Sequence, residues 1–115
     1  MSKREEYNLE FTKKVINGRI YHGCDRNLPP NELTYLCGFL EALHDIEIQA
    51  LIGEIEAAEN EEYYEEYPQS EGYEHYDIQI DIPNFLIGSA GTSQASIPLD
   101  DMRSLLIEWR DFKKS

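Results

Sequence analysis

The chain has 115 residues, of which 41% are hydrophobic, and this is enough for one compact domain with its own core. Its formal net charge is −13 at pH 7, and no run approaches the roughly 20 apolar residues that a membrane-spanning helix needs. An acidic surface repels phosphate backbones and anionic lipids, so the composition argues against direct binding to nucleic acid or to a membrane and favours a basic protein as partner.

The charged residues are distributed unevenly along the chain. Residues 1–26 contain six basic and four acidic side chains, and residues 103–115 contain four basic and two acidic ones. Residues 27–102 contain seventeen acidic side chains and no Lys or Arg. The negative field therefore belongs to the middle of the chain, and at low salt such a field speeds encounter with a basic surface by roughly 10- to 1000-fold.

Residues 7–21 fit two interpretations. Ser2 and Glu5 have the spacing of a capping box, and apolar residues then recur at every fourth position from Tyr7 to Val15, which favours a helix. The same stretch also alternates apolar and polar residues ahead of an Asn-Gly pair at 17–18, as in a β-hairpin with a two-residue turn. We expect the helix and keep the hairpin as the alternative.

Two helices are expected next. After the breaker DRNLPPNEL, Asn31 is a suitable N-cap, and apolar side chains cover most of the circumference of the following segment, as in a central core helix. Asp45 can cap a second helix, which would turn its apolar side chains inward and expose Glu47, Glu54 and Glu56 to water.

The second half of the chain predicts a β-hairpin and a last helix. Alternation from Tyr76 to Ile82 is the clearest strand signal, and FLI at 85–87 can pair with it across a tight turn, whereas GSAGTSQAS at 88–96 has the composition of a loop. From Leu99 onward apolar residues recur at helical spacing, with acids in the first turn and bases in the last, as the helix dipole favours. The predicted fold is α+β, a helix-rich single domain over residues 1–115 with a small antiparallel hairpin packed on the helices.

The sequence points to neither catalysis nor a bound metal. His22 with Cys24, and Cys37 with His44, have spacings that match no common zinc pattern, and Cys37 lies on an apolar stripe where a buried thiol is expected. No nucleophile or Walker motif is present, and the many carboxylates suggest a hydrophilic surface rather than a pair with separated pKa values. We therefore expect no enzyme activity and no cofactor, and a cytoplasmic protein with free thiols.

The most unusual part of the chain is AENEEYYEEYPQSEGYEHYD, residues 58–77, called the acid-aromatic segment below. It holds eight acidic residues and five of the eight tyrosines. A solvated loop would explain the charge but not the rings, whereas Tyr offers broad contact area and Arg can stack on it while pairing with a carboxylate. Because the rings are harder to explain by solubility than the acids, Tyr64 and Tyr67 would be mutated before any acid of the segment. The residues expected to bind a basic protein are Glu61, Glu62, Tyr63, Tyr64, Glu65, Glu66, Tyr67, Glu71, Tyr73, Glu74, Tyr76 and Asp77.

Small size, strong acidity and this acidic, aromatic patch resemble the immunity proteins of bacterial nuclease toxins of the colicin-like and contact-dependent growth inhibition types. The closing segment SIPLDDMRSLLIEWRDFKKS is also similar to that of several such proteins. The resemblance implies a stoichiometric inhibitor in a heterodimer with a basic toxin domain, and it assigns no individual residue. Two alternatives remain open: an acidic nucleic-acid mimic that inhibits a phage-defence nuclease, and a non-enzymatic adaptor with a solubilising acidic loop.

Overall fold

The computed structural model describes residues 2–29, 33–70, 75–89 and 94–114. Within these ranges the chain forms two antiparallel sheets, of strand order β1-β2 and β3-β4-β5, together with four helices, so the fold is α+β as predicted. The elements in chain order are α1 (Lys3–Glu6), β1 (Leu9–Ile16), β2 (Arg19–Arg26), α2 (Thr34–Ala42), α3 (Asp45–Glu59), β3 (Tyr76–Asp81), β4 (Asn84–Ser89), β5 (Ala95–Pro98) and α4 (Leu99–Lys114).

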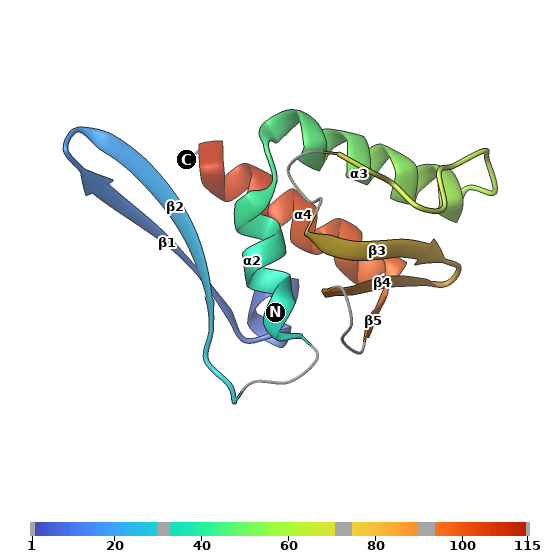
Figure 1. Cartoon of the computed structure of the whole chain (residues 1–115), viewed down its shortest axis with the longest axis horizontal. Helices are drawn as coiled ribbons and strands as arrows, with labels where there is room; N and C mark the ends of the chain where they lie inside the picture. Colours follow the sequence, from blue (N-terminus) through green and yellow to red (C-terminus); the bar gives the residue numbers. More distant parts are fainter. Residues whose placement is uncertain (1, 30–32, 71–74, 90–93, 115) are drawn as a thin grey trace.

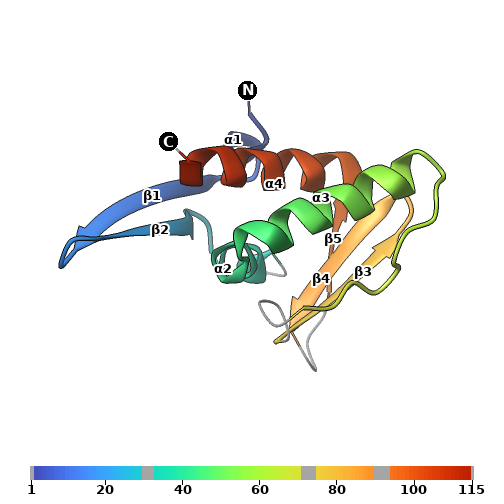
Figure 2. The same ribbon diagram turned by 90° about the horizontal axis from the view of Figure 1, so that it is seen from above.

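The two sheets lie at opposite ends of an elongated molecule of 44 × 31 × 29 Å (Figures 1 and 2). The β1–β2 hairpin reaches away from the body at one end, near the C-terminus of α4. The three-stranded sheet and the C-terminal end of α3 occupy the other end, with α2 between the two sheets. Of the helices in the described ranges, none combines the length and the apolarity that crossing a membrane requires.

Residues 9–26 form a hairpin, so the helix expected over residues 7–21 is wrong and the alternative is correct. Helix α1 ends after one turn, and Asn8 follows it with a left-handed φ of 58°. At the hairpin turn Asn17 and Gly18 have φ values of 51° and 79°, the two positive angles that a type I′ turn requires. Phe11 then packs its ring edge-on against Trp109 of α4, with 5.0 Å between ring centroids, which fixes the base of the hairpin to the body.

Helices α2, α3 and α4 and the inner faces of both sheets share one hydrophobic core. α2 lies at its centre, as its apolar circumference predicts, and α4 buries the apolar face that the sequence assigns to it. The largest fully buried side chains are Trp109, Phe39, Phe85, Leu36, Leu40, Leu43, Ile48, Leu51, Ile55, Ile80, Ile87 and Ile97.

The start of α3 departs from the prediction. Its N-cap is His44, not Asp45, and the N–H of His44 donates to Oε1 of Glu47 at 2.8 Å. Glu47 is therefore only 7% exposed rather than facing water, whereas Glu54 is half-buried and Glu56 is exposed. The N-cap of α2 is Leu33, and the expected cap Asn31 lies outside the described residues.

The segment expected to be a loop, residues 88–96, contributes to two strands. β4 continues to Ser89 and β5 begins at Ala95, while residues 90–93 lie outside the described ranges. β5 pairs antiparallel with β4, with Phe85 opposite Ile97, and it alternates buried and exposed residues. Strand β3 agrees with the predicted alternation up to Asp81, but Ile82 lies in the turn after it and is exposed.

Candidate partner-binding site

The first half of the acid-aromatic segment is positioned by the end of α3. The N–H of Asn60 closes the last helical turn on the carbonyl of Glu56, and Glu61 then takes a left-handed φ of 58°. The N–H of Glu62 donates back to the carbonyl of Ala57 at 2.8 Å, as in other helix ends of this left-handed type. The chain thereby reverses and runs back beside α3 toward β3 (Figure 2).

Residues 62–70, called the strip below, are hydrogen-bonded to α3 on one side and to β3 on the other. On the α3 side, the N–H of Glu65 donates to Oε2 of Glu54 at 2.6 Å, and the hydroxyl of Ser70 donates to the buried carboxylate of Glu47. On the β3 side, the N–H of Ile80 donates to the carbonyl of Glu66 at 2.8 Å. The side chain of Glu66 also accepts from Gln79 at 3.0 Å, and Pro68 is buried, so the strip is fixed between a helix and a strand.

The tyrosines of the segment fall into different environments. Tyr63 and Tyr67 point outward, with 91% and 54% of their surface exposed. Tyr64 instead packs against the core, which makes Tyr63 rather than Tyr64 the better contact residue beside Tyr67. Tyr76 is also half-buried against the core, while Tyr73 lies outside the described residues, as do Glu71 and Glu74.

Tyr76 packs closely on α2. Its ring meets Phe39 edge-on at 5.5 Å between centroids, and a Cβ on Gly38 would lie 2.6 Å from its hydroxyl oxygen, so a larger residue at position 38 would force the Tyr76 side chain to shift. Burial, with a smaller contribution from the nearby carboxylate of Glu41, raises the pKa of Tyr76. Its neighbour Asp77 is exposed on β3, so of this predicted pair Asp77 is the more accessible to a partner.

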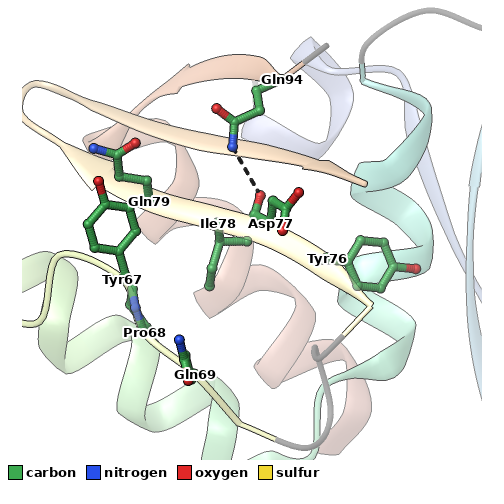
Figure 3. A pocket seen from close by; sticks show the side chains of 8 residues that line it. All are labelled: Tyr67, Pro68, Gln69, Tyr76, Asp77, Ile78, Gln79 and Gln94. Atoms are coloured by element: carbon green, nitrogen blue, oxygen red, sulfur yellow. Dashed lines mark hydrogen bonds between the residues drawn. The ribbon is translucent and has the colours of Figure 1, made fainter. Parts of the chain in front are cut away.

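A groove of about 570 Å³ lies between the strip and β3 (Figure 3). β3 is an edge strand, and the groove follows its first residues up to Gln79, just before Ile80 bonds to the strip. Gln94 borders the groove and donates to the carbonyl of Asp77 at 3.5 Å. The lining side chains are those of Tyr67, Pro68, Gln69, Tyr76, Asp77, Ile78, Gln79 and Gln94.

Among the described residues, the carboxylates of the strip and of Glu61 just before it form no ion pair with a basic side chain. In the ranges that the structure describes, none of the ion pairs involves Glu61, Glu62, Glu65 or Glu66, and all four side chains are exposed. The cations of α4 are engaged elsewhere: Arg103 contacts Glu59 at 3.1 Å and also Asp100, and Lys113 contacts Asp45 at 3.0 Å. The negative charge of the strip is therefore available to an external partner.

The residues considered for zinc do not assemble into a site. Among the described residues, no group of three or more His, Cys, Asp or Glu side chains is placed to hold a metal ion. His22 packs edge-on against Phe112, and burial together with Lys13 and Lys113 lowers its pKa. Cys24 and Cys37 contact each other instead, a proximity that their spacing in the sequence does not reveal.

The described part of the site thus combines an exposed acidic strip, two outward tyrosines and a groove along a strand edge. Comparison of the chain with protein-family models, with curated proteins and with solved structures finds no match.

Proposed function

We propose that the protein is a non-enzymatic inhibitor of a basic protein, and specifically an immunity protein that neutralises the nuclease domain of a bacterial toxin. The observation that carries the proposal is the strip at residues 62–70, which is held from two sides while its carboxylates and two tyrosines face outward. A segment ordered before binding loses less conformational entropy when the complex forms. This role places the protein in the cytoplasm, where a nuclease toxin would meet its substrate.

The chemistry of the strip suits a surface rich in Arg and Lys. An Arg guanidinium can stack on Tyr63 or Tyr67 while it pairs with a neighbouring carboxylate. Close charge pairs across one well-studied nuclease–inhibitor interface are coupled by about 1.5–7 kcal/mol, while the other charges mainly raise the association rate. We therefore expect the two tyrosines to control the dissociation rate and the glutamates to control the association rate.

The test is a titration with the toxin nuclease domain encoded by the neighbouring reading frame. The expected result is a 1:1 complex without nuclease activity, whose association rate falls at least about tenfold between low and high salt. Replacing Tyr63 and Tyr67 together by Ala should weaken binding by about 30-fold or more, if each is an interface anchor. The matched control is Tyr21→Ala, because Tyr21 is an exposed tyrosine on the distant hairpin. Failure to form a complex, or equal affinity of the two variants, would contradict the proposal.

The two alternatives predict different outcomes from the same variants. A nucleic-acid mimic would depend on its carboxylates in place of phosphates, so replacing Glu61, Glu62, Glu65 and Glu66 by Gln would weaken binding far more than removing the two rings. A solubilising loop would make the same four substitutions neutral for partner binding. The outward tyrosines favour the immunity role, because neither a phosphate mimic nor a solubilising loop requires exposed rings.

A further inference from the structure

Two cysteines from different elements meet beneath the hairpin. Cys24 lies on β2 and Cys37 on α2, and they are only 3% and 8% exposed. Their Sγ atoms are 2.9 Å apart, closer than two sulfur atoms in ordinary van der Waals contact, with the Cys24 thiol donating to Cys37. Both are free thiols in this structure.

The surroundings hold this pair in place. The carboxylate of Glu41, one helical turn after Cys37 on α2, accepts the backbone N–H of Cys24 at 2.8 Å and so connects β2 to α2 beside the sulfurs. Cys24 is also directly opposite Phe11 in the hairpin, and Phe11 is anchored on Trp109. The approach of the sulfurs is therefore built into the packing of the hairpin on the body.

We propose that Cys24 and Cys37 are a dithiol site that reacts with a low-molecular-weight disulfide, such as oxidised glutathione, to form a disulfide bond between β2 and α2. Bond formation needs the sulfurs to come about 0.9 Å closer than their present 2.9 Å. This inference is independent of the proposed partner, because it uses neither the acid-aromatic segment nor its ligand.

An entry route and an order of attack are present. A cavity of about 250 Å³ borders both cysteines and is also lined by Asp25, Arg26 and Leu28, so a small disulfide can reach the sulfurs. The hydrogen bond from Cys24 lowers the pKa of Cys37 against the opposing effects of burial, Glu41 and Asp25, while the same bond and burial raise the pKa of Cys24. Cys37 is also the more exposed of the two cysteines, at 8% against 3%, so we assign Cys37 as the attacking thiolate and Cys24 as the resolving thiol.

The exchange balances in two steps. The Cys37 thiolate attacks one sulfur of oxidised glutathione, the glutathione S–S bond breaks, and one glutathione leaves as a thiolate that takes up a proton. Cys24 then loses its proton to solvent and attacks the Cys37 sulfur of the mixed disulfide, which releases the second glutathione. Two protein thiols are oxidised, and one glutathione disulfide is reduced to two thiols.

The experiment is treatment of the folded, reduced protein with oxidised glutathione, followed by acid quenching, alkylation and intact mass analysis. The expected product is a monomer that has lost two hydrogen atoms, carries no glutathione and resists alkylation until a reductant is added. Its Tm should rise by on the order of 10 °C, because the bond closes the loop between residues 24 and 37. The Cys24→Ser variant should stop at one glutathione on Cys37, and Cys37→Ser should react far more slowly.

Three results would overturn the proposal, and all are read on the wild-type protein, so misfolding of a variant cannot hide them. One is the absence of oxidation in the folded protein although both thiols react in guanidinium chloride. Another is a stable product with a glutathione on each cysteine. The last is a disulfide-linked dimer in place of the oxidised monomer.

Discussion

The buried carboxylate of Glu47 joins the start of α3 to the acid-aromatic segment, so its removal should loosen both. Glu47→Ala deletes the acceptor for the N–H of His44, a helix cap worth about 1 kcal/mol. It also deletes the acceptor for the Ser70 hydroxyl, and a hydrogen bond to a charged group contributes about 1.5–3 kcal/mol. The expected loss is about 2.5–4 kcal/mol of unfolding free energy, or a fall in Tm of roughly 10–16 °C for a domain of this size.

Two further variants distinguish the helix cap on His44 from the hydrogen bond between Ser70 and Glu47. Glu47→Gln keeps an acceptor for His44 and should lose less than about 1 kcal/mol, whereas Ser70→Ala removes only the hydrogen bond to Glu47 and should lose about 1.5–3 kcal/mol, the larger part of the Glu47→Ala effect. Denaturation in guanidinium chloride gives the free energies, and hydrogen exchange at the Ile80 amide reports whether the strip remains on β3. The reasoning is refuted if Glu47→Ala is as stable as wild type, or if the Ile80 amide exchanges at the wild-type rate in both Glu47→Ala and Ser70→Ala.

The remaining predictions concern the packing of α2, the hairpin and pH. Gly38→Ala should cost about 1 kcal/mol, because overpacking against the Tyr76 hydroxyl outweighs the gain in helix propensity. Adding Tyr76→Phe should restore or exceed wild-type stability, and a double-mutant cycle without coupling would exclude the clash. His22 has a lowered pKa in the folded state, so the unfolded chain takes up the proton first as the pH falls below about 6.5, and stability should fall over that range. Urea denaturation from pH 7.5 to 5.5 should show a smaller loss of unfolding free energy for His22→Gln than for the wild type. An equal pH dependence in the two proteins would contradict the role of His22. Phe11→Ala should cost about 3–5 kcal/mol and change the fluorescence of Trp109, and an effect below about 1 kcal/mol would show that the hairpin is not anchored there.

The regular elements with long periodic patterns were predictable from the sequence. α4 and β3 begin where their patterns begin, because each buries one continuous face against the core. The helix expected over residues 7–21 was wrong because it rested on Tyr7, Phe11 and Val15, which are four residues apart. A spacing of four keeps side chains on one face of a helix and, being even, on one face of a strand as well. The capping-box spacing of Ser2 and Glu5 favoured a helix but belongs only to the single turn of α1, whereas the Asn-Gly pair at 17–18 favoured the hairpin.

Contacts between elements that are distant in the sequence left no such signal. The burial of Glu47 depends on Ser70, which lies 23 positions away, and the meeting of Cys24 with Cys37 depends on how β2 docks on α2. β5 has four residues, too few for its alternation to outweigh a Gly- and Ser-rich composition. The location of the candidate site was predictable from charge and tyrosine content. That Tyr63 faces outward and Tyr64 inward was not predictable, because the apolar residues of the acid-aromatic segment follow no repeating spacing.

The charged side chains are also separated by sign along the long axis of the molecule, which gives it an electric dipole. The hairpin and the C-terminal turn of α4 carry much of the positive charge, among them Lys14, Arg19 and Lys114, while the acidic strip and the end of α3 lie at the far end of the long axis. In the field of a positively charged surface, net charge draws the molecule closer and the dipole exerts a torque that turns its acidic end forward. Orientation can thus precede contact, so that a larger share of random collisions begins with the outward tyrosines facing the partner.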